Sequence, residues 1–186
     1  GYLMVSPLAG FGDWKEFLQG LQPVAAWKAG LTALGLVSSG LTIFVGVQPA
    51  DVMRAQPVLA AMGKTITHFG AACSGQAVKA VNQVILAGAY LGVAEGIVLA
   101  IRAGLDVGQV VAALGGGAAQ SWVLENRSGR MIENDYPLGF KVALHRKDLG
   151  IALDLAGQLG AVLPVSALAA QLETGLIANG HGDEDM

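Results

Sequence analysis

Two polar side chains that could carry acid–base chemistry, Lys79 and Asn82, stand near the start of a long apolar stretch. Residues three positions apart lie on the same face of a helix, so the ammonium and the amide would share one side. Partial burial lowers the pKa of a lysine toward neutral pH, where it can give and take a proton. A lysine near a helix end is more often a solvated or snorkelling side chain, and spacing alone does not decide between the two.

The stretch that carries this pair runs from Gly75 to Arg102 and contains no proline. Its alanine, leucine, isoleucine and valine content predicts one helix of about seven turns. Gly88, Gly92 and Gly96 recur at every fourth position and form a strip along one side. Each glycine costs up to about 1 kcal/mol of helix stability relative to alanine, so we expect another helix backbone to approach this strip. The stretch is therefore predicted to be a buried helix with a polar pair at its front end.

The composition favours a protein that buries much of its surface. A length of 186 residues suits one domain, or one domain and part of another, and 53% of the residues are hydrophobic against 13% charged. Only the stretch 75–102 is long enough to span a bilayer, but it carries Lys79, Asn82, Gln83 and Glu95, and ionisable groups inside a membrane are costly. We therefore expect a homo-oligomer, a dimer or tetramer, and no membrane. An integral membrane helix is the less favoured alternative.

Charge and cysteine content point away from several partners and compartments. The net charge of −3 supplies no basic stripe that could neutralise phosphates, so no nucleic-acid partner is expected. The single cysteine, Cys73, fits a reducing compartment. Charged residues at Asp13, Lys15 and Glu16 come too early for a signal peptide. A cytoplasmic location is expected.

The order of elements predicts a mainly α fold. The β-branched run 41–46 predicts a buried strand, residues 49–63 a helix and the alternating run 64–70 a second strand, which together have the size of a βαβ unit. After residue 70 the pattern is helical, with further helices expected at 107–114, 118–126, 138–159 and 164–179. Two short helices are expected at 13–21 and 24–37. The predicted domains are an α/β segment over 1–70 and an all-α domain over 71–186.

Familiar nucleotide, metal and nucleophile motifs are missing from the sequence. No G-x-G-x-x-G or G-x-S-x-G string occurs, and the three histidines lack metal-ligand spacing, so no metal is expected. His181 among Asp183, Glu184 and Asp185 is a candidate cation site, but a solvated acidic tail is the preferred interpretation.

Four stretches resemble, in the same order, the β-hydroxyacid dehydrogenase family, which includes 3-hydroxyisobutyrate dehydrogenase, tartronate semialdehyde reductase and glyoxylate/succinic semialdehyde reductases. Residues 41–63 resemble the last strand and helix of the family's nucleotide domain, and residues 63–106 resemble the junction and first long helix. Residues 139–165, with the K-D-L signature, resemble the second long helix, and NGHGDEDM resembles the segment before the last helix. The resemblance covers about residues 40 to 186, and the G-x-x-x-K-x-x-N string at 75–82 is its most specific part.

The resemblance implies a 6-phosphogluconate dehydrogenase C-terminal-like all-α domain, used for catalysis and dimerisation, after a small remnant of a Rossmann domain. It implies the NADP- or NAD-dependent interconversion of a small hydroxy acid and its semialdehyde or keto acid. The family's catalytic lysine falls on Lys79 and its substrate-orienting asparagine on Asn82. The resemblance further implies substrate contacts at Gly75 and Phe140 and cofactor-side contacts at Lys147 and Asp148, although an ordinary surface helix turn explains the last two residues equally well.

The chain departs from the family in its first part. The family's glycine fingerprint and its D-A-P-V-S-G-G substrate loop have no convincing counterpart, and the part before the long helix is shorter than a full Rossmann domain. A truncated or rearranged dehydrogenase is therefore expected, or one whose dinucleotide half comes from elsewhere. A non-catalytic helical dimerisation module derived from the family is the alternative. The sequence selects neither one hydroxy acid nor NAD over NADP.

Overall fold

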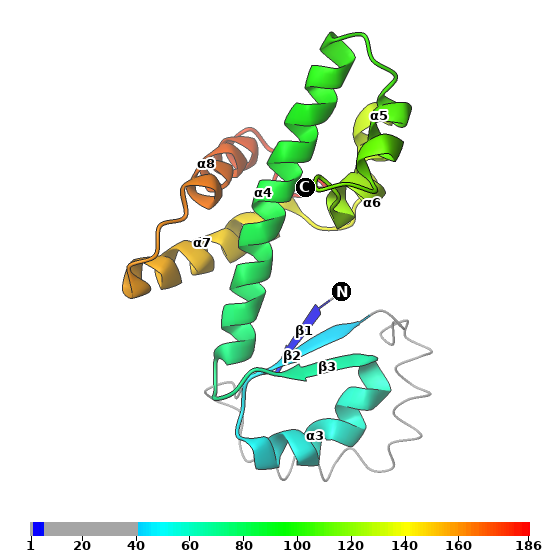
Figure 1. Cartoon of the computed structure of the whole chain (residues 1–186). Coiled ribbons are helices and arrows are strands. Elements are labelled where there is room, and N and C mark those ends of the chain that lie inside the picture. Colours follow the sequence, from blue (N-terminus) through cyan, green and yellow to red (C-terminus); the bar gives the residue numbers. More distant parts are fainter. Residues whose placement is uncertain (1, 6–40) are drawn as a thin grey trace. The chain divides into compact units, whose positions relative to one another are not determined.

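The structure is a computed structural model in which residues 2–5 and 41–186 are described (Figure 1). The chain divides into two compact units, Gly1–Lys79 and Ala80–Met186, which we describe separately. The predicted domain boundary near residue 70 marks the change of composition and stays a prediction. The two short helices predicted at 13–21 and 24–37 lie outside the described residues.

The first unit contains a parallel sheet with the strand order β1-β2-β3 (Figure 1). Its strands are β1 (Tyr2–Val5), β2 (Thr42–Val45) and β3 (Thr65–His68), and helix α3 (Pro49–Met62) connects β2 to β3. Ile43 and Val45 of β2 are fully buried and pack with Leu59 of α3. The predicted βαβ unit is confirmed. Strand β1 was not predicted.

The second unit is helical. Helix α4 (Ser74–Arg102) runs into it from the first unit, and α5 (Val107–Leu114), α6 (Trp122–Glu133), α7 (Val142–Leu159) and α8 (Pro164–Ala178) follow. In Figure 1, α7 and α8 lie on one side of α4, and α5 and α6 on the other. Ala87, Leu149, Ala169 and Ala170 form a buried core among α4, α7 and α8. The described residues therefore have the predicted mainly α fold with a small α/β segment.

Some helix ends agree with the predicted ranges, and others do not. Asp106 accepts a hydrogen bond from the Gln109 amide at the start of α5, whose bounds are those predicted. Gly160, in the left-handed conformation, follows the end of α7 at residue 159, where the predicted range also ends. The helix predicted at 118–126 was placed too early. Ser121 accepts from the Leu124 amide as the N-cap, and α6 then continues to Glu133.

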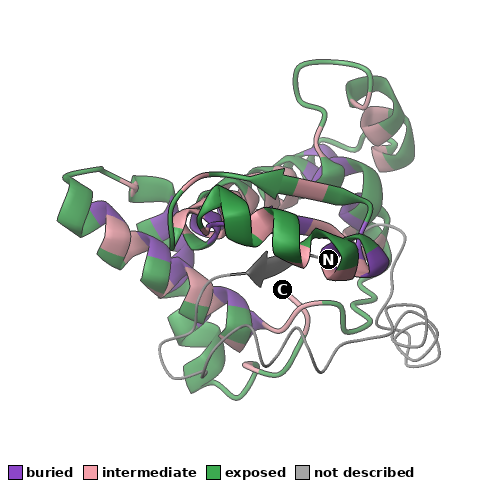
Figure 2. Ribbon diagram, turned by 90° about the horizontal axis from the view of Figure 1, so that it is seen from below, coloured by how far each residue is buried: buried purple, intermediate pink, exposed green. Residues whose placement is uncertain are grey.

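Helix α4 is far less buried within this chain than predicted. Only 17% of its most apolar window is buried, and Ile85 and Leu99 are 65% and 70% exposed. Exposed residues, drawn in green, cover much of the helical surface in Figure 2. Among the described helices, α4 alone has the length and composition that could cross a membrane, and the core helices of water-soluble proteins meet the same criterion. The predicted buried helix is thus wrong for the chain taken by itself.

The glycine strip of α4 does not receive a helix backbone from the described part of the chain. A Cβ added to Gly92 or Gly96 would meet no atom within 4 Å, and one added to Gly88 would meet only Val165 Cγ1, at 3.8 Å. The expected close helix approach is therefore not found there, and the strip stays open.

Candidate active site

The front of α4 in the first unit lies directly against the end of β2. A Cβ added to Gly46 would lie 2.6 Å from the Gly75 amide nitrogen, and one added to Gly75 would lie 2.7 Å from the Phe44 carbonyl oxygen. Both positions therefore require glycine because two backbones meet. This packing accounts for Gly75 without a ligand, and its substrate contact stays a prediction.

The turn between β3 and α4 is held by side chains of its own segment. His68 Nε2 lies 2.7 Å from the Val47 carbonyl oxygen and 2.9 Å from that of Gly70. Gly70 and Cys73 have positive φ angles of 112° and 73°, and the Ser74 hydroxyl donates to the Ala71 carbonyl oxygen. Cys73 is exposed. These contacts fix where α4 begins.

Lys79 and Asn82 lie one turn apart in α4, as the spacing predicted, and both are partly exposed. The arrangement is compatible with proton exchange at Lys79 and hydrogen bonding at Asn82.

A chain of side-chain contacts joins Asn82 to helix α7 in the second unit. Asn82 Nδ2 donates to Gln83 Oε1 at 2.8 Å, and Gln83 Nε2 donates to Asp148 Oδ2 at 3.0 Å. Lys147 Nζ lies 3.1 Å from Asp148 Oδ1. The side chain of Lys147 is 63% exposed and that of Asp148 14%, while Gln83 is 1% exposed. The buried Gln83 therefore connects Asn82 with Asp148, which in turn contacts Lys147. The sequence had assigned Asn82, Asp148 and Lys147 to a site.

Gln83 was not among the predicted site residues. The available signal was a glutamine directly after the candidate asparagine, within an apolar helix, where a buried polar group needs partners. Nothing in the spacing indicated that its partner would come from a helix 65 positions later.

Phe140 directly precedes Lys141, the N-cap residue of α7. Its ring packs edge-on against the His145 ring, with centroids 6.2 Å apart. Its carbonyl oxygen accepts from the Met186 amide at 3.0 Å. Both contacts hold Phe140 in place, and its substrate contact stays a prediction.

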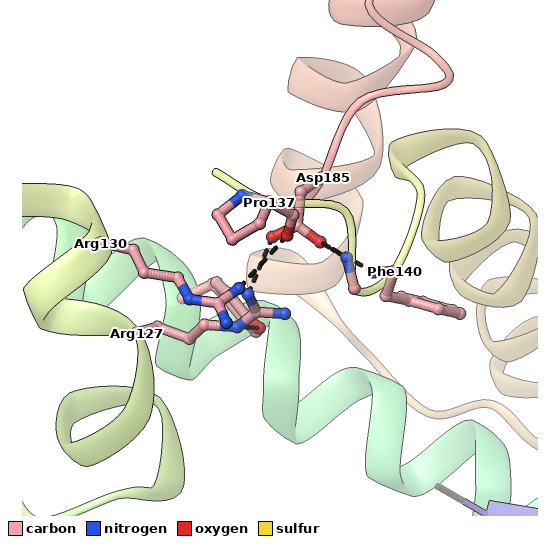
Figure 3. A network of polar contacts seen from close by, with 7 residues as sticks. Arg127, Arg130, Pro137, Phe140 and Asp185 are labelled. Carbon is pink, nitrogen blue, oxygen red and sulfur yellow. Dashed lines mark hydrogen bonds and ion pairs between the residues drawn. The ribbon is translucent and has the colours of Figure 1, made fainter. Parts of the chain in front are cut away.

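The end of the chain folds back onto α6 and the start of α7 (Figure 3). Asp185 Oδ2 accepts from Arg127 Nη1 at 2.9 Å, and Asp185 Oδ1 accepts from the amides of Gly139 and Phe140 at 2.7 and 2.8 Å. The Asp185 side chain is 1% exposed. The interpretation of a solvated tail is therefore wrong for Asp185, although Asp183 is 88% exposed. Because Asp185 engages the amides of residues 139 and 140, α7 begins at Val142 and not at residue 138 as predicted.

Two ionisable groups near the tail have shifted pKa values. Burial raises the pKa of the Tyr90 phenol, and the neighbouring Arg127, whose Nε donates to the phenol oxygen at 3.0 Å, opposes that shift. The hydrogen bond from Lys141 Nζ lowers the pKa of the Asp183 carboxyl. Neither group takes part in the contacts that join Asn82, Gln83, Asp148 and Lys147.

His145 and Glu173 form a second polar pair, between α7 and α8. His145 Nδ1 contacts Glu173 Oε1, and both residues are buried. The other polar atoms of the pair, His145 Nε2 and Glu173 Oε2, are buried without a hydrogen-bond partner. No group of three or more metal-binding side chains occurs among the described residues.

The open glycine strip of α4 lines an apolar groove of about 380 Å³ in the second unit. Valines and a leucine of α5 also line the groove, together with Ser121 and Leu124. The groove contains almost no polar groups that could orient a small molecule. Such an apolar groove is typical of a surface on which another protein segment packs.

Comparisons with known proteins agree with this fold. The profile of a family described as the NAD-binding domain of NADP-dependent 3-hydroxyisobutyrate dehydrogenase matches residues 73–186. A 2-hydroxy-3-oxopropionate reductase of Escherichia coli is 39% identical over 82% of this chain and 52% of its own length. A probable 3-hydroxyisobutyrate dehydrogenase-like protein of Arabidopsis thaliana is 39% identical over 81% of this chain and 45% of its own.

The solved structure of 3-hydroxyisobutyrate dehydrogenase from Mycobacterium tuberculosis with L-serine superimposes with a TM-score of 0.69. It is 33% identical and covers 75% of this chain and 50% of its own. The chain thus spans about half the length of the curated relatives it matches.

Proposed function

This chain belongs to the 3-hydroxyisobutyrate dehydrogenase family, and from that premise we propose that it supplies the acid–base part of an NADP- or NAD-dependent hydroxy acid dehydrogenase. The reaction interconverts a small hydroxy acid and its semialdehyde or keto acid. The observation that carries the proposal is the contact chain from Asn82 through Gln83 to Asp148 and Lys147, because it unites substrate-side and cofactor-side candidates.

In this proposal Lys79 is the general acid and base. In the reducing direction its ammonium donates a proton to the substrate carbonyl oxygen as the carbonyl carbon accepts a hydride. In the oxidising direction the neutral amine removes the hydroxyl proton as the hydride leaves. Asn82, one turn further along α4, donates a hydrogen bond that orients the substrate oxygen or carboxylate.

The bound nicotinamide supplies or accepts the hydride. Lys147 fits a role beside the cofactor, because its exposed ammonium, held 3.1 Å from Asp148, can pair with an anionic group. The sequence has no glycine fingerprint for a pyrophosphate, so this chain contributes only part of a dinucleotide site.

The test combines cofactor binding with turnover. The purified chain is titrated with NADPH and NADH while tryptophan fluorescence is followed, and turnover of 3-hydroxyisobutyrate and related hydroxy acids is then measured. We expect Lys79→Ala to keep cofactor binding and lose turnover, while Lys64→Ala, which removes an exposed lysine, keeps both. If neither cofactor binds up to millimolar concentration, the proposal fails for this chain alone.

A second candidate is a non-catalytic helical dimerisation module, favoured by the apolar groove along the glycine strip. The groove, together with the exposed Ile85 and Leu99, suits a helix of a second copy, since glycines permit close backbone approach. Analytical ultracentrifugation decides whether the chain associates. Stable association without cofactor binding would favour the module, and association with turnover would favour an oligomeric enzyme. A cytoplasmic location without nucleic-acid or membrane partners belongs to both proposals.

A further inference from the structure

We propose that Gln83 is a positioning residue, which sets the orientation of the Asn82 amide and couples it to Asp148 on α7. The inference deepens the proposed function and rests on it for its catalytic meaning. Its structural part concerns only Asn82, Gln83, Asp148 and Lys147, which all lie in the second unit.

The chemistry of the three side chains allows one direction of hydrogen bonding. A carboxylate only accepts, so the Gln83 atom 3.0 Å from Asp148 Oδ2 must be the amide nitrogen. The Gln83 oxygen then lies on the Asn82 side, where it can only accept. Asn82 must therefore turn its nitrogen toward Gln83, at the 2.8 Å observed. The carboxylate thus fixes two amides whose oxygen and nitrogen are otherwise nearly equivalent in shape.

The orientation decides what Asn82 presents to a substrate. One N–H of its amide is used on Gln83, so the Oδ1 atom and the second N–H remain for a ligand. A rotation of the amide by half a turn would exchange oxygen and nitrogen. A substrate carboxylate that accepts from the amide would then face an oxygen and lose the bond.

Burial makes this control effective. Gln83 is 1% exposed, so water cannot readily replace either of its bonds, and a buried amide that loses a partner is left unsatisfied. Asp148 also lies 3.1 Å from Lys147 Nζ through its other oxygen. A single carboxylate therefore contacts the cofactor-side lysine directly and the substrate-side asparagine through Gln83.

Two single variants and their combination test the direction of the bonds. Asp148→Asn removes the group that fixes the direction, and Gln83→Glu places two carboxylates against each other. The double variant Gln83→Glu/Asp148→Asn restores one direction, because the carboxylate at position 83 accepts both from Asn82 and from the amide at position 148. Asp154→Asn is the matched control, since Asp154 is exposed on the same helix.

The first measurement is heteronuclear NMR of the side-chain amides in the full chain, with the Asn82 signal identified by its loss in Asn82→Asp. We expect Asp148→Asn to shift or broaden the Asn82 amide signal through the hydrogen bonds of Gln83. Asp154→Asn should leave the signal unchanged, and the double variant should restore a single sharp signal. An effect of Asp148→Asn no larger than that of Asp154→Asn would overturn the proposal.

The second measurement is turnover. Each single variant should lower kcat/KM roughly ten- to a hundredfold, because a misplaced orienting group costs rate, and the double variant should recover part of the loss. Unchanged kcat/KM in both single variants overturns the positioning role. If the chain shows no turnover but the NMR pattern is as expected, the coupling through Gln83 stands and the proposed dehydrogenase function of this chain fails.

Discussion

Replacing Asp185 by asparagine should strongly destabilise the second unit, because this carboxylate is the meeting point of three donors. It accepts from Arg127 Nη1 and from the amides of Gly139 and Phe140, and its side chain is 1% exposed. The Arg127 side chain is 10% exposed, so water cannot replace the lost partner. An asparagine of the same shape would direct an NH₂ group at one of these donors.

The expected magnitude follows from burial. Removing one partner of a buried ion pair costs about 3–5 kcal/mol, and asparagine keeps one acceptor oxygen, so we expect a loss of about 3 kcal/mol. That is a large share of the roughly 5–15 kcal/mol by which a domain is stable. With a urea m-value of about 1–3 kcal/mol/M, the unfolding midpoint should fall by about 1–3 M.

The assay is urea unfolding followed by far-ultraviolet circular dichroism, which reports on the helices. Asp183→Asn is the control, since the Asp183 side chain is 88% exposed and pairs with the Lys141 ammonium, 2.7 Å away. Its midpoint should stay where it is in the unchanged chain. Equal midpoints for the Asp185 and Asp183 variants would refute the reasoning that the tail carboxylate is a buried partner of Arg127.

Three further predictions concern other parts of the chain. Because burial raises the pKa of Tyr90 above its ordinary value of 10.0, the stability it contributes is complete below that pH and is lost as pH rises through the folded pKa. Ultraviolet titration of the phenolate, compared with Tyr90→Phe, should show one late-ionising tyrosine. Gly92→Ala meets no atom within 4 Å and should raise the free energy of unfolding of the monomer by up to about 1 kcal/mol, measured in urea, while weakening self-association measured by ultracentrifugation if copies pack on the strip. Gly75→Ala should lower the thermal midpoint, because its Cβ would lie 2.7 Å from the Phe44 carbonyl oxygen, whereas Gly116→Ala, with nothing within 4 Å, should not.

Sequence patterns within a few residues predicted those helices and helix ends that depend on nearby residues. The proline-free apolar run became α4, and the bounds of α5 and the end of α7 agree with the predicted ranges. The start of α7 was misplaced because it depends on a carboxylate 45 positions away, which engages the Phe140 amide. Burial of α4 was overestimated because apolar composition does not tell whether the covering surface belongs to the same chain.

The candidate site was predictable in part. The positions of Lys79 and Asn82 on one helix follow from their spacing, and the connection between α4 and α7 does not. Gln83 and Asp148 are 65 residues apart, and hydrogen bonds over such separations leave no period in the sequence. The sequence can indicate that a buried glutamine needs a hydrogen-bond partner. That the partner is Asp148 is seen only in the packing of α4 against α7.

The ion pair between Arg127 and Asp185 also constrains when the second unit can fold during translation. Asp185 follows Arg127 by 58 positions, so at about 5–20 residues per second the ribosome needs about 3–12 s to deliver it after Arg127. During that interval Arg127 has already been made, while the carboxylate that pairs with it and the segment that caps the start of α7 have not. The contacts between α6 and the segment before α7 can therefore be completed only after Asp185 has been made.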